Sequence, residues 1–106
     1  MYLDYVKERE GYESVETEHG FAIYKIFGEE CYLRDIYVKP GMRKSGEAKK
    51  LSQMVKEKAL EAGCTFMTGS VNLDANNPTV SVKAILGDGF DVAKYHNNLL
   101  LFTKRI

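Results

Sequence analysis

One stretch of the sequence, residues 38–48, combines residue types that together could hold a phosphate group. A run of β-forming residues ends there, a Pro-Gly turn follows, and a short loop opens into the longest helical pattern of the chain. The first backbone N–H groups of a helix have no intrahelical partner, and the helix dipole favours anions at that end. Gly46 lets the backbone approach a phosphate closely, while Arg43 and Lys44 add positive charge. The pattern predicts a site for a phosphate-bearing ligand without identifying the ligand.

The loop motif is a weak signal when it is taken alone. Arg43, Gly46 and Ala48 form the pattern R-x-x-G-x-A, which about one chain of this length in ten would contain by chance. The sequence has neither the phosphate loop G-x-x-x-x-G-K-S/T nor the three-glycine dinucleotide fingerprint. The alternative is that these residues simply connect a strand to a helix.

The flanks of the loop make the stretch far more specific. Together with them it resembles the acetyl-CoA signature of the GNAT superfamily of N-acetyltransferases, at Leu33, Ile36, Val38, Pro40, Arg43, Gly46, Ala48 and Leu51. Residues 32–38 are particularly similar to diamine N-acetyltransferases. Downstream, Asn77, a helical pattern to Leu86 and the pair Gly89-Phe90 resemble the family's second block. The resemblance covers roughly residues 21–106.

The resemblance implies a GNAT-like acyl-CoA N-acyltransferase fold with acetyl-CoA as co-substrate and no metal. Backbone amides would hold the CoA pyrophosphate at Arg43, Lys44, Ser45, Gly46, Glu47 and Ala48. The backbone of Ile36, Tyr37 and Val38 would pair with pantetheine where two parallel strands splay apart, and an amide near Val38 could stabilise an oxyanion. Asn77 and Ser81 would lie near the cofactor's distal arm or the thioester.

The acceptor would be an amine, of a protein or a small molecule, that attacks the acetyl carbonyl directly. A lysine-like amine has a pKa near 10.4, so a base must first remove a proton, and an acid should protonate the departing thiolate. The sequence departs from the diamine acetyltransferases at both positions: Arg34 replaces their glutamate, and Ile85 falls where their acidic tyrosine is expected. Neither side chain can replace the group it stands for.

The remaining candidates are Asp35 and Glu30 as base, and Tyr95 and Ser81 as acid. Each also has a plain structural interpretation. Asp35 could pair with Arg34 or a lysine, and Glu30 could be a solvated carboxylate in a turn. Tyr95 could be a hairpin side chain with its hydroxyl at the sheet edge.

The elements that must position these residues follow from periodicity and from turn residues. Apolar residues at helical spacing over 46–62 predict a long helix, with Ser45 as N-cap and Gly63 just past its end. Shorter helices are expected at 2–9 and 79–86, and strands at 12–18, 21–27, 31–38, 64–71, 90–95 and 99–104. The order predicts an α/β or α+β domain: a mixed sheet with helices on both sides, in which the long helix crosses between two parallel strands.

Composition limits the remaining possibilities. With 106 residues, 44% of them hydrophobic, the chain is expected to fold as one domain over residues 1–106. The 15 basic residues balance the 15 acidic ones, so no overall field draws it to nucleic acid or membrane. The sequence has no apolar run of membrane length and no signal-peptide pattern at its start, and Cys31 and Cys64 suit a reducing compartment. These features predict a cytoplasmic protein.

Only about ten residues precede the first expected strand, whereas the GNAT family has a strand and two helices there. The acceptor site would then be open enough for a protein amine, or be completed by a second subunit in a homodimer. The sequence predicts an N-acetyltransferase; the alternative is a catalytically weak or inactive domain of the same fold that binds CoA or another protein.

Overall fold

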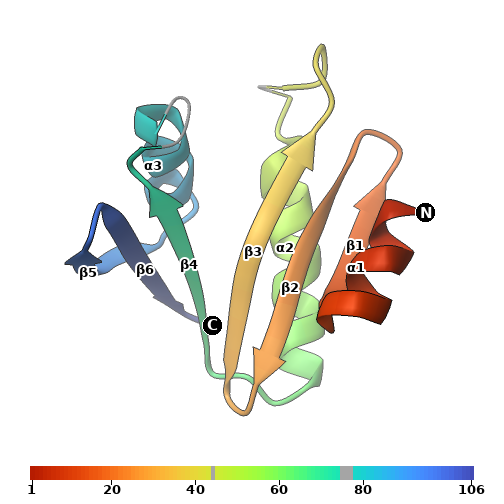
Figure 1. Cartoon of the computed structure of the whole chain (residues 1–106), viewed down its shortest axis with the longest axis horizontal. Coiled ribbons are helices and arrows are strands. Elements are labelled where there is room, and N and C mark those ends of the chain that lie inside the picture. The colour runs from red at the N-terminus through yellow and green to blue at the C-terminus, as the bar shows by residue number, and fades with distance from the viewer. Residues whose placement is uncertain (44, 75–77) are drawn as a thin grey trace.

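The computed structural model describes residues 1–43, 45–74 and 78–106 (Figure 1). Its elements are α1 (Tyr2–Glu10), β1 (Glu13–Thr17), β2 (Gly20–Phe27), β3 (Glu30–Val38), α2 (Glu47–Glu61), β4 (Phe66–Asn72), α3 (Pro78–Gly87), β5 (Asp91–His96) and β6 (Leu99–Arg105). Each element expected from the sequence is present, with its ends within two residues of the expected bounds. None of the helices in the described ranges is long and apolar enough to cross a bilayer.

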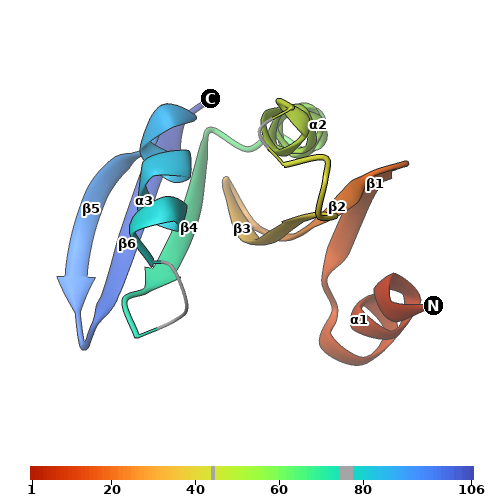
Figure 2. The ribbon, with the colours of Figure 1, turned by 90° about the horizontal axis from the view of Figure 1, so that it is seen from above.

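The strands form one mixed sheet in the order β1-β2-β3-β4-β6-β5. All neighbours are antiparallel except β3 and β4, which are parallel and are connected through α2. Viewed from above, the sheet has two blades, β1–β3 and β4–β6–β5, which meet along the β3–β4 contact (Figure 2). The expected crossover between parallel strands is therefore confirmed, and it lies at the middle of the sheet.

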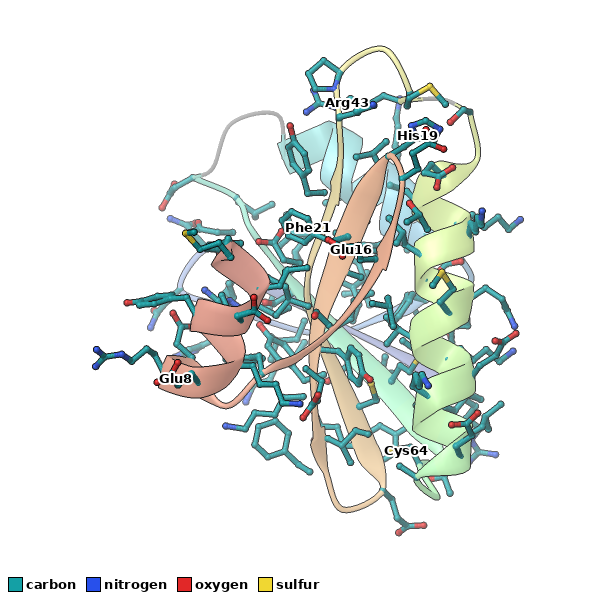
Figure 3. The ribbon with its side chains drawn as sticks, turned by 90° about the vertical axis from the view of Figure 1, so that its right-hand side faces the viewer. Glu8, Glu16, His19, Phe21, Arg43 and Cys64 are labelled. Atoms are coloured by element: carbon teal, nitrogen blue, oxygen red, sulfur yellow. The ribbon has the colours of Figure 1, made fainter. Side chains whose placement is uncertain are left out.

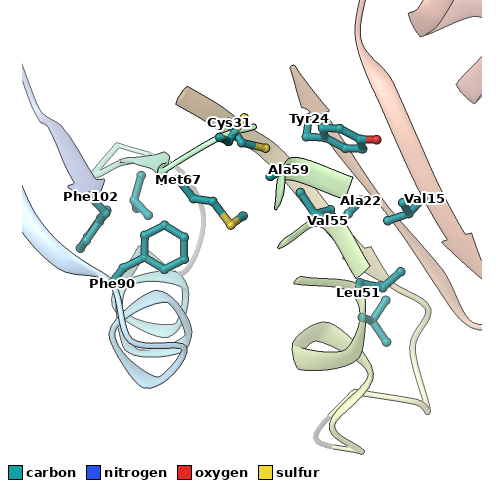
Figure 4. Close-up of a cluster of buried hydrophobic side chains, with 13 residues drawn as sticks. Val15, Ala22, Tyr24, Cys31, Leu51, Val55, Ala59, Met67, Phe90 and Phe102 are labelled. Atoms are coloured by element: carbon teal, nitrogen blue, oxygen red, sulfur yellow. The ribbon is translucent and has the colours of Figure 1, made fainter. Parts of the chain in front are cut away.

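The long helix α2 covers one face of the first blade. Leu51, Val55 and Ala59 are fully buried, because their spacing of four residues directs all three towards the sheet (Figure 4). Met67 from β4 lies in the same core cluster, so a single core extends across both blades. Gly63 follows the helix with φ 87°, as expected for the residue after a helix end.

The start of α2 corrects one expectation: the N-cap is Gly46, not Ser45. The Ser45 hydroxyl donates to the Met42 carbonyl across the preceding turn, so it is not available to cap the helix. Gly46 has φ 86°, a left-handed conformation that residues with a Cβ rarely adopt.

The opposite face of the first blade is covered by α1 (Figure 3). Val6 of α1 and Ile23 of β2 are both fully buried, yet neither belongs to the core cluster under α2. The sheet therefore has two distinct faces here, an α2 face and an α1 face, and functional side chains can be assigned to one or the other.

Candidate active site

A gap opens between the two parallel strands at the middle of the sheet. Pairing of β3 with β4 ends at Leu33 opposite Gly69, although β3 continues to Val38 and β4 to Asn72. The ribbons of β3 and β4 accordingly diverge beyond these residues (Figure 1). Of the last five residues of β3, residues 35–38 pair with β2, Arg34 is unpaired, and none of the five pairs with β4, so this edge of β3 carries backbone groups without a strand partner.

The direction of the backbone groups in β3 shows what this open edge offers. The Tyr37 carbonyl lies towards β2, so close that a Cβ at Gly20 would be 2.2 Å from it. The Val38 carbonyl instead accepts a hydrogen bond from Arg43 in the following loop. Because backbone groups alternate along a strand, those of Ile36 and Val38 face the gap, whereas Tyr37 presents only its side chain to a ligand.

The loop into α2 is open at the position where an anion was expected. Among the residues that the structure describes, a Cβ built on Gly46 would meet no atom within 4 Å, and Ser45 and Ala48 are exposed. Arg43 fixes the loop to the strand end: its Nε lies 2.9 Å from the Val38 carbonyl, and its guanidinium lies 5.9 Å from the centre of the Tyr37 ring. Figure 3 shows Arg43 at the N-terminal end of α2. Lys44 and Asn77 lie outside the described residues.

A β-bulge determines which side chains face the acceptor side of the gap. The β2–β3 register shifts at Arg34, so that Lys25 pairs with Tyr32 while Ile23 pairs with Asp35. Directly paired residues share a face, and so do residues two apart in one strand. Tyr32 and Asp35 therefore share the α1 face, although residues three apart in a regular strand would lie on opposite faces.

The bulge residue Arg34 has a structural partner. Its guanidinium forms an ion pair with Glu10 of α1 and lies 4.8 Å from the centre of the Tyr12 ring. Partial burial lowers the pKa of Arg34, but the hydrogen bond and the charge of Glu10 outweigh that effect and raise it above its usual value. Asp35, an exposed residue, makes no ion pair with any residue of the described ranges. The interpretation of Asp35 as the partner of Arg34 is therefore wrong.

The other sequence-predicted acids and bases lie away from Asp35. Glu30 is the first residue of β3, about 15 Å along the strand, and it accepts a hydrogen bond of 2.6 Å from Thr68. Tyr95 is on the edge strand β5, where its hydroxyl donates to Asn98 at 3.0 Å, as in its plain hairpin interpretation. Ser81 belongs to α3 by its backbone, and its side chain lies outside the described part of the chain.

One hydroxyl at the gap was missed by the sequence analysis. The Tyr32 hydroxyl lies 3.0 Å from the Ser70 Oγ, which joins β3 to β4 at the point where their pairing ends. A tyrosine in a strand is an ordinary β-former, so its local sequence gives no signal of such a position. Only the β3–β4 register reveals it.

The two cysteines are buried and reduced, as expected. Burial, followed by the nearby Cys64 and Glu30, raises the pKa of the Cys31 thiol to about 12. Burial also raises the pKa of Cys64. Within the ranges that the structure describes, no three His, Cys, Asp or Glu side chains are grouped in a way that could hold a metal ion. These thiols therefore pack as core residues.

The fold resembles solved acetyltransferases. PaiA N-acetyltransferase from Thermoplasma acidophilum, solved in complex with coenzyme A, superposes with a TM-score of 0.78 at 17% identity, over 95% of this chain and 66% of that one. A GNAT-family acetyltransferase from Desulfovibrio desulfuricans gives a TM-score of 0.79 at 16% identity, over 96% of this chain and 76% of that one. Similarity at these identities establishes the fold.

Sequence comparison establishes the family. Thialysine N-epsilon-acetyltransferase from Sus scrofa is 42% identical over 68 residues, a match that covers 63% of this chain and 39% of the relative. The chain thus matches about two fifths of the length of that protein. The family model for the acetyltransferase (GNAT) family matches residues 4–85, which include the gap, the loop and α2. The chain belongs to the acetyltransferase (GNAT) family.

Proposed function

We propose that this protein is an acetyl-CoA-dependent N-acetyltransferase that transfers the acetyl group to a primary amine by direct attack. The observation that carries the proposal is the unpaired edge of β3 beyond Leu33, which leads to the exposed loop at Gly46. A thioester cofactor with a phosphate-rich tail could use both features, with the strand edge for its amides and the helix start for its phosphates. The coenzyme A complex of the Thermoplasma relative is consistent with this assignment.

Acetyl-CoA would supply an activated acetyl group as a thioester. Backbone groups of Ile36 and Val38 would bind its amide-containing arm, and the amides of residues 43–48 would bind its pyrophosphate. Arg43 would contribute charge: within the described residues its terminal guanidinium nitrogens make no hydrogen bond, because Nε alone is used to fix the loop. Gly46 itself adds no side-chain atom to this entrance.

The acceptor would approach from the α1 face. Asp35 is the exposed carboxylate beside the gap on that face, and it would take the proton that a cationic amine must lose before attack. Aromatic rings adjoin it: Phe21 stacks on Tyr37 at 5.5 Å and contacts Tyr2 of α1 at 5.9 Å. A carboxylate next to exposed aromatic faces favours a cationic amine over a neutral one.

Calorimetry with CoA tests the first half of the proposal, with Gly46→Glu as the disrupting variant. The matched control is Gly63→Glu at the other end of α2: its φ is 87° against 86° for Gly46, and both positions are equally open, so the two variants carry the same backbone strain. Gly46→Glu should abolish binding by placing a negative charge on the anion site, while Gly63→Glu should retain it. Equal affinities in the two variants would reject the proposed phosphate site.

Turnover tests the second half. The protein is incubated with acetyl-CoA and a panel of amines (diamines, lysine and its thioether analogues, lysine peptides and peptide N-termini), and the release of free thiol is followed. Acetylation of a cationic primary amine is expected. CoA binding without turnover on any amine would instead identify a CoA-binding module without catalysis.

A further inference from the structure

The hydroxyl pair of Tyr32 and Ser70 lies at the point of the sheet where the pairing of β3 with β4 ends. Tyr32 is directly paired with Thr68, but its hydroxyl reaches diagonally past it to Ser70, one residue beyond the last paired residue Gly69. The bond therefore spans β3 and β4 just where the strands separate. A ligand that enters the gap along β3 would meet this hydroxyl pair at its inner end.

The bulge in β3 also places Tyr32 on the same face of the sheet as Asp35. Tyr32 and Asp35 share the α1 face only because Arg34 is an extra residue in β3. A proton acceptor and a proton donor are thus on one side of the gap, with the donor nearer to its closed end. The charged side chains on the α1 face near Tyr32 are Lys25, opposite it in β2, then Glu30, Arg34 and Asp35 in β3, and Glu10 of α1, which is paired with Arg34.

Two other hydroxyls of the described residues that could be considered are engaged elsewhere. Thr68 donates to Glu30, Tyr95 donates to Asn98 at the far edge of the sheet, and the position expected for an acidic tyrosine holds Ile85, an aliphatic side chain packed on the core. Tyr32 is half-buried and is linked to a second hydroxyl that can either donate or accept. This arrangement can deliver a proton and recover one.

We propose that the Tyr32 hydroxyl, oriented by Ser70, is the acid that protonates the departing CoA thiolate. The inference rests on the proposed function. The amine nitrogen forms a bond to the acetyl carbon, the carbon–sulfur bond breaks with its electron pair going to sulfur, and Tyr32 gives its proton to that sulfur. The nitrogen loses a proton as the amide forms, and this proton restores the tyrosine hydroxyl through Ser70 or water. Asp35 removes the earlier proton, the one that the ammonium form of the acceptor carries.

Tyr32→Phe is the decisive variant, because it retains the ring and removes only the oxygen. Its kcat is expected to fall about 100-fold, while the Kd for CoA by calorimetry stays within about twofold of the wild-type value. Tyr5→Phe, at an exposed tyrosine of α1 outside the gap, is the matched control and should leave kcat unchanged. Ser70→Ala, which removes the orienting partner, should lower kcat about tenfold with an unchanged KM for acetyl-CoA.

The solvent deuterium isotope effect separates proton transfer from a purely structural role. The wild-type kcat should be lower in D2O than in H2O because a proton moves in this step, and Tyr32→Phe should lose this difference. A kcat within twofold of wild type would overturn the proposal. So would a reduced kcat that retains the isotope effect, since the residue would then only support the strand. If the wild-type protein binds no CoA or acetylates no amine, the proposed function itself fails.

Discussion

At the scale of single residues, Asp35 is the group on which the proposed chemistry depends most directly. It is exposed on the α1 face beside the gap, and the neighbouring arginine is already paired with Glu10. Asp35→Asn keeps the shape of the side chain and removes its ability to take a proton. We expect kcat at neutral pH to fall by about 10²–10⁴-fold, with the Kd for CoA unchanged.

The control for Asp35→Asn is Asp91→Asn. Asp91 is an exposed carboxylate on the edge strand β5 and pairs with Thr103 of β6. It belongs to the same sheet, but β4 and β6 lie between its strand and the gap. Steady-state kinetics on the best amine found in the panel provide the comparison. Equal kcat values for the two variants would show that solvent, not Asp35, removes the proton.

The buried thiol of Cys31 provides a prediction about stability. Its folded-state pKa of about 12 lies above the value near 8.5 of an unfolded cysteine, so the folded protein holds this proton more tightly. The stabilising effect is complete below about pH 8.5 and is lost as the pH rises towards 12. The free energy of unfolding should therefore fall above about pH 9, by at most about 1.4 kcal/mol per pH unit.

Urea titrations between pH 7 and pH 10.5 would measure this slope. Cys31→Ala cannot ionise at that position, so its slope should be shallower than that of the wild-type protein even though the lost sulfur lowers its stability at every pH. If the free energy of unfolding fell with pH at the same slope in the two proteins, ionisation of Cys31 would not be the cause of the loss of stability. The pKa of Tyr24, raised mainly by burial, adds a similar but smaller trend in both proteins.

At the scale of the elements, the loop between β3 and α2 holds its shape through Arg43. Its Nε donates to the Val38 carbonyl, and lysine has at this position of the side chain a methylene group that cannot donate. Arg43→Lys keeps the charge and loses this bond, so it should raise the Kd for CoA about tenfold. Arg9→Lys, at an exposed arginine of α1, should leave the Kd unchanged in the same calorimetric titration.

Some features of these elements could be predicted from the sequence, and others could not. The strands, the helices and the anion loop follow from local signals, such as the four-residue spacing of Leu51, Val55 and Ala59. The bulge at Arg34 and the end of β3–β4 pairing at Gly69 depend on register between distant segments, which no local pattern encodes. For that reason the loop that joins β3 to α2 could be located from the sequence, whereas the position of Tyr32 could not, and the roles of the loop and of Asp35 stay predictions.

At the scale of the whole molecule, the gap requires two blades that diverge without coming apart. Direct β3–β4 pairing covers only the residue pairs from Glu30–Phe66 to Leu33–Gly69. A polar contact on the α2 side of the sheet also connects the two blades. The buried Ser52 hydroxyl of α2 donates to the Asp88 carboxylate after α3 at 2.5 Å, and Lys104 of β6 donates to the Asp88 carbonyl at 2.8 Å.

This contact predicts that a small change far from the ligand will weaken the whole fold. Ser52→Ala removes the only side-chain donor from α2 to Asp88 among the described residues and should cost about 1–2 kcal/mol of unfolding free energy. In a domain of this size that corresponds to a decrease of about 4–15 °C in Tm. Gln53→Ala, on the exposed side of the same helix, should change Tm far less, and thermal unfolding followed by circular dichroism measures both. Equal Tm values for the two variants would mean that this polar contact adds nothing to the β3–β4 pairing and to the hydrophobic core that the blades share, and that the gap keeps its shape without it.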